Sequence, residues 1–179
     1  MLDLDNTALV VIDVQGKLAE LMHQKESLFE NLARLIQGAQ ILEMPIILTE
    51  QYPKGLGRTI DALSSLMPAV TPVEKITFSC CANPDFSEVL RGLHRKQLLV
   101  CGIETHICVY QTTMDLLTAG YEVHIVSDAV SSRSAHNKQL GLERMKSAGA
   151  VLTGTEMALF ELLHIAQGEK FKQISKLVK

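Results

Sequence analysis

Six short apolar runs alternate with segments of helical periodicity, and this alternation constrains the fold more than any other feature of the chain. The runs lie at residues 7–14, 45–49, 73–76, 97–101, 121–128 and 150–153. Strands that are apolar along their whole length are buried on both faces, which is typical of parallel sheets covered by helices. The sequence therefore predicts an α/β fold with a six-stranded parallel sheet between two layers of helices.

The segments between the runs carry apolar residues at three- and four-residue spacings, as amphipathic helices do. In residues 27–43, for example, Leu28, Leu32 and Leu35 fall on one face. The other expected helices lie at residues 60–67, 84–93, 103–119, 136–147, 155–163 and 170–179. Because a chain of 179 residues has the usual size of one domain, we expect a single domain over residues 1–179.

The charge distribution and the apolar runs argue against two classes of partner. The formal net charge is -3, and no basic cluster longer than Arg95-Lys96 precedes the C-terminal stretch 170–179. Since nucleic-acid binding requires concentrated lysine and arginine, we expect no nucleic-acid partner. No apolar run reaches the length of a membrane span, and the first residues lack the pattern of a signal peptide. We therefore expect no membrane partner.

The cysteines and histidines do not form the spacings of a disulfide framework or a metal site. The four cysteines are at positions 80, 81, 101 and 108, and the six histidines show no HxH or HxxxH pairing. Cys80 and Cys81 are expected to be ordinary packing residues. We therefore expect a reduced, cytoplasmic protein without a metal or another cofactor.

Three residues with reactive side chains fall near the carboxyl ends of expected strands. Asp13 ends the first run, Lys75 lies in the third, and Cys108 follows the fourth. Ligands of parallel α/β sheets bind beyond the carboxyl ends of the strands, where the strand order reverses. We therefore expect the three side chains to meet at one edge of the sheet. Taken singly, they are equally compatible with a turn residue, a surface lysine and a small buried side chain.

Cys108 falls in the first turn of an expected helix that begins directly after a strand. The helix N-terminus and a neighbouring Lys75 ammonium would lower the pKa of the cysteine and favour a thiolate. Asp13 can accept the thiol proton and later activate water. Backbone N–H groups near Glu104 and Cys108 can stabilise an oxyanion. These residues together predict a cysteine nucleophile.

Three separated motifs carry a family resemblance. They are Val10-Val-Ile-Asp13-Val-Gln15, Lys75 followed by Phe78, and Gly102-Ile-Glu-Thr-His-Ile-Cys108-Val with Thr112. With these motifs the chain resembles the isochorismatase-like cysteine hydrolases from residue 7 to residue 163. The resemblance implies a Rossmann-like three-layer α/β/α sandwich, an Asp-Lys-Cys triad at Asp13, Lys75 and Cys108, and a homo-oligomer of two or more chains. It also implies a cis peptide bond between Ile103 and Glu104, which directs the Glu104 N–H toward the oxyanion.

Two differences from the motifs of other family members indicate to which branch of the family the chain is most similar. Nicotinamidases carry an Asp-x-His metal site, with a second histidine, in the segment after the second strand. Here that segment, residues 50–58, contains no histidine. Enzymes that act on isochorismate often replace the nucleophile, whereas Cys108 is present in this chain. The segment instead resembles that of short, metal-independent isochorismatase domain-containing proteins.

The walls of the pocket are expected to come from Gln15, Tyr52, Phe78 and Ile107, with Leu56 and Arg58 as further contributions from the loop at 50–58. His106 precedes Cys108 by two residues and is therefore expected to face away from it on the helix.

The expected function is that of a metal-independent cysteine hydrolase that cleaves C–N bonds other than peptide bonds. Cys108 would attack a small amide-like or related substrate and form a covalent intermediate. A binding or scaffold protein that keeps the fold without catalysis is the alternative. Hydrolysis of RNA is disfavoured because the chain lacks a basic cluster.

Overall fold

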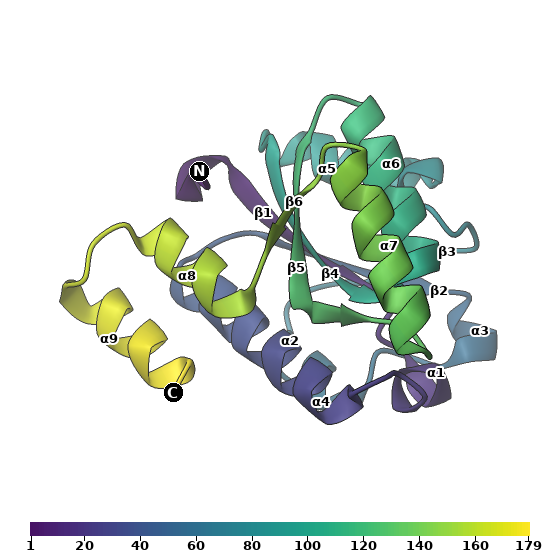
Figure 1. The fold of residues 1–179 in the computed structure, drawn as a ribbon, viewed down its shortest axis with the longest axis horizontal. Helices are drawn as coiled ribbons and strands as arrows, with labels where there is room; N and C mark the ends of the chain where they lie inside the picture. Colours follow the sequence, from purple (N-terminus) through teal and green to yellow (C-terminus); the bar gives the residue numbers. More distant parts are fainter.

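The computed structural model describes all residues of the chain, 1–179, and contains one six-stranded sheet in which every strand runs parallel to its neighbours (Figure 1). The strands are β1 (Thr7–Ile12), β2 (Ile46–Gln51), β3 (Val73–Lys75), β4 (Gln97–Ile103), β5 (Glu122–Ser131) and β6 (Val151–Thr153). Their order across the sheet is β3-β2-β1-β4-β5-β6. The predicted α/β fold and the parallel sheet are thus confirmed.

The strand order reverses between β1 and β4. The chain proceeds from β1 outward through β2 to β3, and then returns to pair β4 with the other side of β1. In the register of this pair, Ile12 lies beside Gly102. A crevice forms at such a reversal beyond the carboxyl ends of the strands. The residues that directly follow β1 and β4 therefore lie next to each other.

Helices cover both faces of the sheet, so the molecule has three layers (Figure 1). One layer contains α1 (Gly16–Glu20), α2 (Lys25–Ile41), α4 (Asp61–Ser64), α8 (Thr155–Leu163) and α9 (Gly168–Leu177). The other contains α5 (Pro84–Gly92), α6 (Tyr110–Thr118) and α7 (Ala135–Ser147). The remaining short elements are η1 (Leu4–Asn6), α3 (Pro53–Leu56), η2 (Cys80–Ala82) and the π-turn η3 (Thr105–Val109).

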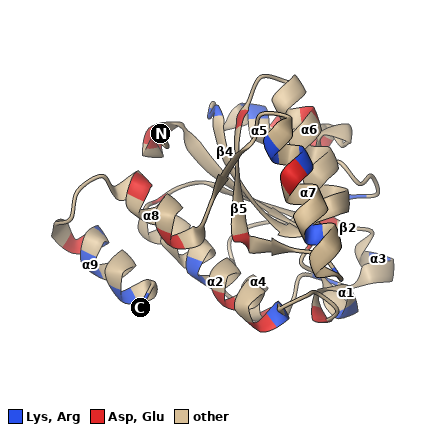
Figure 2. Ribbon diagram, viewed as in Figure 1, with Lys and Arg blue, Asp and Glu red and all other residues tan.

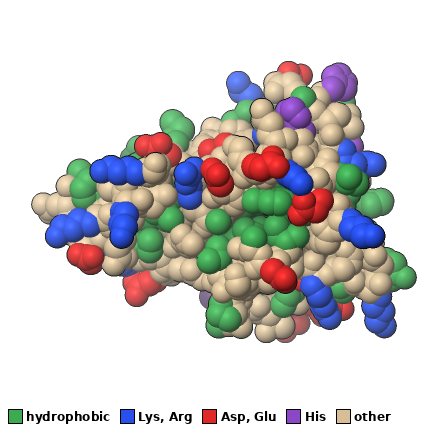
Figure 3. Space-filling view, turned by 90° about the horizontal axis from the view of Figure 1, so that it is seen from below, with side chains coloured by type: hydrophobic (Ala, Val, Ile, Leu, Met, Phe, Trp, Pro, Cys, Tyr) green, Lys and Arg blue, Asp and Glu red, His purple; other side chains and the backbone are tan.

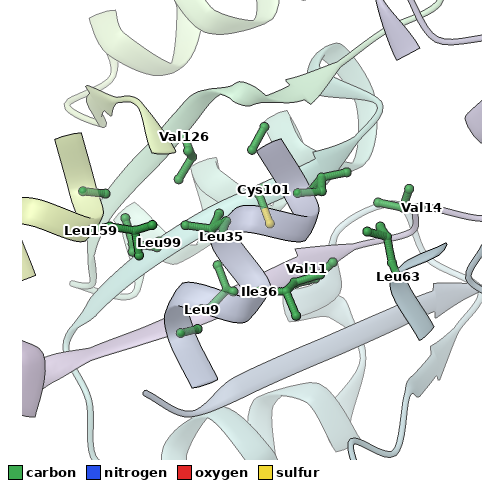
Figure 4. Close-up of a cluster of buried hydrophobic side chains, with 14 of the residues drawn as sticks. Leu9, Val11, Val14, Leu35, Ile36, Leu63, Leu99, Cys101, Val126 and Leu159 are labelled. Carbon is green, nitrogen blue, oxygen red and sulfur yellow. The ribbon is translucent and has the colours of Figure 1, made fainter. Parts of the chain in front are cut away.

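Alternate residues of the central strands point into two separate hydrophobic cores. Leu9 and Val11 of β1 pack with α2, whereas Val10 belongs to the core under α5, α6 and α7. In Figure 4, the side chains of the first core gather between the sheet and Leu35 and Ile36 of α2. Because both faces of β1 and β4 are covered, these strands are buried throughout. This explains why their sequences are continuous apolar runs.

Basic and acidic residues are interspersed along the outer helices, including α2, α7 and α9 (Figure 2). Burial of the sheet between two layers leaves the outward helix faces to interact with solvent. No helix is long and apolar enough to cross a membrane.

Some element boundaries differ from those predicted. β2 continues to Gln51 and β5 to Ser131, because the polar residues at their ends still pair with neighbouring strands. The segment 50–58, expected to be a loop, therefore begins within β2 and then forms α3. The helix expected directly after Gly102 begins instead with the π-turn η3, and α6 follows at Tyr110.

Candidate active site

Asp13 directly follows β1 and forms a buried ion pair with Lys75. The Lys75 Nζ donates to Asp13 Oδ2 at 2.5 Å, and the two side chains are 0% and 4% exposed, respectively. Asp13 has a φ of 52°, in the left-handed region, so the chain turns sharply where the strand ends. The structure thus brings together two of the three residues that the sequence placed in a triad.

Lys75 reaches this carboxylate from β3, the edge strand, past the intervening strand β2. Its ammonium also donates to the carbonyl oxygens of Thr77 at 3.0 Å and Phe78 at 3.2 Å. An ammonium has three donors, so all three N–H groups of Lys75 are used. Such complete satisfaction is what a buried charge requires.

Thr49 of β2 binds the other oxygen of the same carboxylate. Its hydroxyl donates to Asp13 Oδ1 at 2.7 Å, and its carbonyl accepts a bond from the Asp13 N–H at 3.3 Å. Both carboxylate oxygens therefore have fixed partners. Thr49 was not predicted as a site residue. It is nevertheless the polar last residue of the apolar run 45–49, a position similar to that of Asp13 near the end of the run 7–14.

Cys108 lies in the π-turn η3, at the beginning of the helical segment after β4, and is buried. Its sulfur lies 4.0 Å from Gln51 Oε1. Burial raises the pKa of the Cys108 thiol well above its ordinary value, and the negative charge of Asp13 raises it further. Lys75 acts in the opposite direction. The predicted lowering of this pKa is therefore wrong, because desolvation outweighs the ammonium.

The peptide bond between Ile103 and Glu104 is cis, as the family resemblance implies. The Glu104 carboxylate is turned away toward Arg133, whose backbone N–H donates at 3.0 Å and whose Nε donates at 3.2 Å. The Glu104 carbonyl accepts bonds from the N–H groups of Ile107 and Val109. These bonds connect the end of β4 to the turn that carries Cys108.

A cavity of about 150 Å³ lies at the carboxyl ends of these strands, above the reversal of strand order. Its lining comprises Asp13, Leu18, Gln51, Leu56, Phe78, Ile103, Glu104, Ile107 and Cys108. Most of these side chains are apolar. A larger and more open groove of about 460 Å³ lies between α6 and α7, away from Asp13, Lys75 and Cys108. We place the candidate active site in the smaller cavity because the reactive groups meet there.

Two of the four residues expected in the pocket wall do not line the cavity. Phe78 and Ile107 do. Gln15 instead donates from Nε2 to the carbonyl of Gly57 at 2.7 Å and so fastens the α3 segment to the end of β1. Tyr52 is 54% exposed, and its ring packs against Gly55. In this structure Gln15 connects two segments and Tyr52 faces outward, and a role of either residue in substrate binding stays a prediction.

Gln51 and Leu18 line the cavity but were not predicted. Gln51 lay in the segment that lacked a clear period, and Leu18 lies in α1, a five-residue helix that shows no strong pattern. Leu56 comes from the covering segment, as expected, whereas Arg58 binds Glu50 and Glu74 instead.

The remaining cysteines and the histidines do not line the cavity. All four cysteines are free thiols, and no group of three potential ligands is arranged to hold a metal ion. Cys80 is buried, and desolvation raises its pKa to about 11. His106 Nδ1 lies 2.9 Å from the hydroxyl of Ser132 and not in the cavity.

Comparisons with known proteins identify the family and support the fold. The family model of the isochorismatase domain matches residues 7–157. The chain therefore belongs to the isochorismatase family. The secreted isochorismatase effector Isc1 of Phytophthora sojae is 40% identical over 182 residues, which cover 97% of this chain and 85% of that relative.

Two solved structures are similar over almost the whole chain. The MAR1 ribonuclease from Caenorhabditis elegans has a TM-score of 0.92 and 40% identity, with 99% of this chain and 91% of that chain covered. YcaC from Pseudomonas aeruginosa, solved with hexane-2,5-diol and covalent acrylamide, has a TM-score of 0.93 and 25% identity, with 98% and 90% covered.

Proposed function

We propose that the protein is a metal-independent cysteine hydrolase that cleaves a C–N bond, other than a peptide bond, in a small amide-like substrate. One observation carries the proposal: the Asp13–Lys75 pair and the Cys108 thiol meet at one cavity, at the reversal of strand order. A nucleophile, a proton acceptor and an enclosing apolar wall are the parts that such a reaction requires.

The reaction begins with a neutral thiol, since burial raises the pKa of Cys108. The sulfur attacks the amide carbon while its proton moves to Asp13, and the carbonyl electrons move to oxygen. The backbone N–H groups of Glu104 and Cys108 stabilise this oxyanion. Asp13 then gives its proton to the nitrogen, the C–N bond breaks, and the amine leaves behind a thioester.

Water completes the cycle. It attacks the thioester carbonyl while Asp13 takes its proton, and the same proton then returns to the sulfur as the C–S bond breaks. The products are a carboxylic acid and the free thiol. Lys75 holds the Asp13 carboxylate in place throughout and opposes the rise in the Cys108 pKa.

Ribonuclease activity is a second candidate, favoured by the printed name of the C. elegans neighbour at 40% identity. The face of the molecule that Figure 3 shows does not favour it. On the face drawn in Figure 3, basic and acidic side chains alternate, and no continuous basic patch covers that face. A protein that binds RNA through its phosphates requires such a patch. A third candidate, a binding protein without catalysis, would keep the cavity but need no proton transfer.

The test uses purified protein and a panel of small amides, with released ammonia or amine as the measurement. We expect turnover that is lost in Cys108→Ala and in Asp13→Asn but kept in Cys81→Ala, a half-buried thiol outside the cavity. Mass spectrometry of the quenched wild-type reaction should show an acyl group on Cys108. Degradation of labelled RNA that survives in both site variants, without amide turnover, would overturn the proposal.

We also propose that the protein is a cytoplasmic homo-oligomer, as the family resemblance implies. The four free thiols support a reducing compartment. Light scattering of the purified protein measures the number of chains, and a mass of one chain at micromolar concentration would contradict the oligomer.

A further inference from the structure

We infer that Gln51 determines the specificity of this site, and that the substrate is an uncharged carboxamide with a small apolar acyl group. This inference rests on the proposed function, because it assumes that Cys108 is the nucleophile. It goes further by naming the atom that recognises the leaving nitrogen and by stating the charge and size of the acyl group.

Two hydrogen bonds fix the orientation of Gln51. Its backbone N–H donates to Gln15 Oε1 at 2.6 Å, and its side-chain Nε2 donates to the carbonyl of Thr77 at 3.1 Å. Reversing the side-chain amide would place two acceptors against each other at Thr77. The carbonyl oxygen Oε1 is therefore the end that lies beside the sulfur, 4.0 Å from Cys108 Sγ.

Before reaction the Cys108 thiol is the donor to this oxygen, at 4.0 Å; once the thiol proton moves to Asp13, Oε1 requires a donor from the substrate. In the proposed reaction, the leaving nitrogen must lie near Asp13, which gives it a proton, and Gln51 and Asp13 line the same cavity. A carboxamide N–H can satisfy Gln51 Oε1 while the carbonyl carbon faces the sulfur. A tertiary amide or an ester offers no such donor and would leave a desolvated oxygen unpaired, which is costly.

The charges around the cavity exclude an anionic substrate. Asp13 lines the cavity, the Glu104 carboxylate is turned toward Arg133, and no arginine or lysine lines the cavity. The nearby Lys75 ammonium already donates to one carboxylate and two carbonyls. A substrate carboxylate would therefore lose its water without gaining a cation. The site accordingly selects a neutral acyl group.

The volume of the cavity limits the size of that group. Its apolar wall consists of Leu18, Leu56, Phe78, Ile103 and Ile107. A cavity of about 150 Å³ is the size that accommodates benzene in a protein core, and drug-sized ligands occupy roughly 300–1,000 Å³. An acyl group of roughly six non-hydrogen atoms therefore fills the site.

The experiment compares the rates at which four thiol-directed probes alkylate Cys108. Acrylamide, N,N-dimethylacrylamide, methyl acrylate and acrylate share one reaction, in which the sulfur bonds to the terminal carbon and the thiol proton moves to the neighbouring carbon. Peptide mass spectrometry measures labelling of Cys108, and each rate is divided by the rate for glutathione. We expect acrylamide to exceed each of the other three probes by about tenfold or more.

The variant Gln51→Leu should reduce the normalised acrylamide rate about tenfold and leave the N,N-dimethylacrylamide rate nearly unchanged. The unchanged rate with N,N-dimethylacrylamide also shows that the site of the variant is folded. The control Gln139→Leu, on the exposed side of α7, should change neither rate. If Gln51→Leu does not fold, the probe preference of the wild-type protein decides the question by itself.

The two possible failures are distinct. Equal normalised rates for acrylamide, N,N-dimethylacrylamide and acrylate, with amide turnover that is lost in Cys108→Ala, would overturn the inference and leave the proposed hydrolase intact. Failure of every probe to label Cys108, together with no release of ammonia or amine from the amide panel, would contradict the proposed function itself.

Discussion

Gly141 of α7 packs directly against the backbone of Thr105, in the turn that carries Cys108. A Cβ atom built on Gly141 would lie 2.9 Å from the Thr105 carbonyl oxygen and 3.1 Å from the His106 Cα. Both neighbours are backbone atoms, so they cannot rotate away as a side chain can. The position of the nucleophile therefore depends on a glycine in a helix that follows it much later in the chain.

Gly141→Ala should displace this turn and reduce activity more than stability. Overpacking costs about 1–3 kcal/mol, offset by about 1 kcal/mol from the better helix propensity of alanine. A displacement of the sulfur should slow amide turnover, or acrylamide labelling of Cys108, roughly tenfold or more. The control is Gly92→Ala in α5, where no atom lies within 4 Å of the added Cβ. Equal rates in the two variants would show that the contact does not position Cys108.

Thr49→Val removes the donor to Asp13 Oδ1 and leaves that buried oxygen unpaired. We expect a loss of about 1–3 kcal/mol in the free energy of unfolding, measured by urea denaturation, together with lower turnover. Thr113→Val is a matched control, because the Thr113 hydroxyl is buried without a hydrogen-bond partner. Removing that hydroxyl should leave stability unchanged or increase it. A greater loss in Thr113→Val than in Thr49→Val would contradict the assigned hydrogen bond.

The sheet and the residues at its carboxyl edge could be predicted because strands that are buried on both faces are apolar along their whole length. Each central strand is a continuous apolar run, and a reactive residue directly after such a run, such as Asp13, lies at the edge where ligands bind. Lys75 was located by the same reasoning, although its contact with Asp13 spans 62 positions of sequence.

The cavity wall could be predicted only in part: Phe78, Ile107 and Leu56 were expected there, whereas Leu18 and Gln51 were missed because they do not follow hydrophobic periodicity. The polar residues Glu50 and Gln51 extend β2 by pairing with Glu74 and Lys75 of β3. Glu50 is buried because its carboxylate accepts bonds from Thr59, which no local pattern predicts. The direction of the Cys108 pKa was also missed, since a helix N-terminus is visible in sequence and the extent of desolvation is not.

Removing one charge of the buried Asp13–Lys75 pair should destabilise the protein more than removing both. Lys75→Met leaves a buried carboxylate without its cation and should cost about 3–5 kcal/mol in the free energy of unfolding. The double variant Lys75→Met/Asp13→Asn removes both charges and should recover much of that loss without recovering turnover. As a control, Lys25→Met breaks an exposed pair with Glu20 and should cost less than about 1 kcal/mol. Chemical denaturation of the wild type and the three variants decides whether the charges are coupled.

Asp13→Asn should make Cys108 more reactive toward a simple alkylating reagent while abolishing amide turnover. The negative charge of Asp13 raises the pKa of Cys108, so its removal must lower that pKa and increase the thiolate fraction at any given pH. Lys75 lowers the same pKa, so Lys75→Met must have the opposite effect. The asparagine side chain introduced by Asp13→Asn retains an oxygen for the Lys75 ammonium and an amide group for the Thr49 hydroxyl, so the site can keep its hydrogen bonds.

The measurement is the rate of iodoacetamide labelling of Cys108 at several fixed pH values between about pH 6 and pH 10, where the thiolate fraction of a thiol with a raised pKa still increases with pH. Peptide mass spectrometry is the readout, and circular dichroism checks folding. Relative to wild type, the rise in rate should move to lower pH in Asp13→Asn and to higher pH in Lys75→Met. Cys81 should keep its profile in both variants, because neither Asp13 nor Lys75 is among the groups that shift its pKa. If the Cys108 profile moved to higher pH in Asp13→Asn, Asp13 would not be the neighbour that raises the pKa of the thiol, and its role as proton acceptor would lose its physical basis.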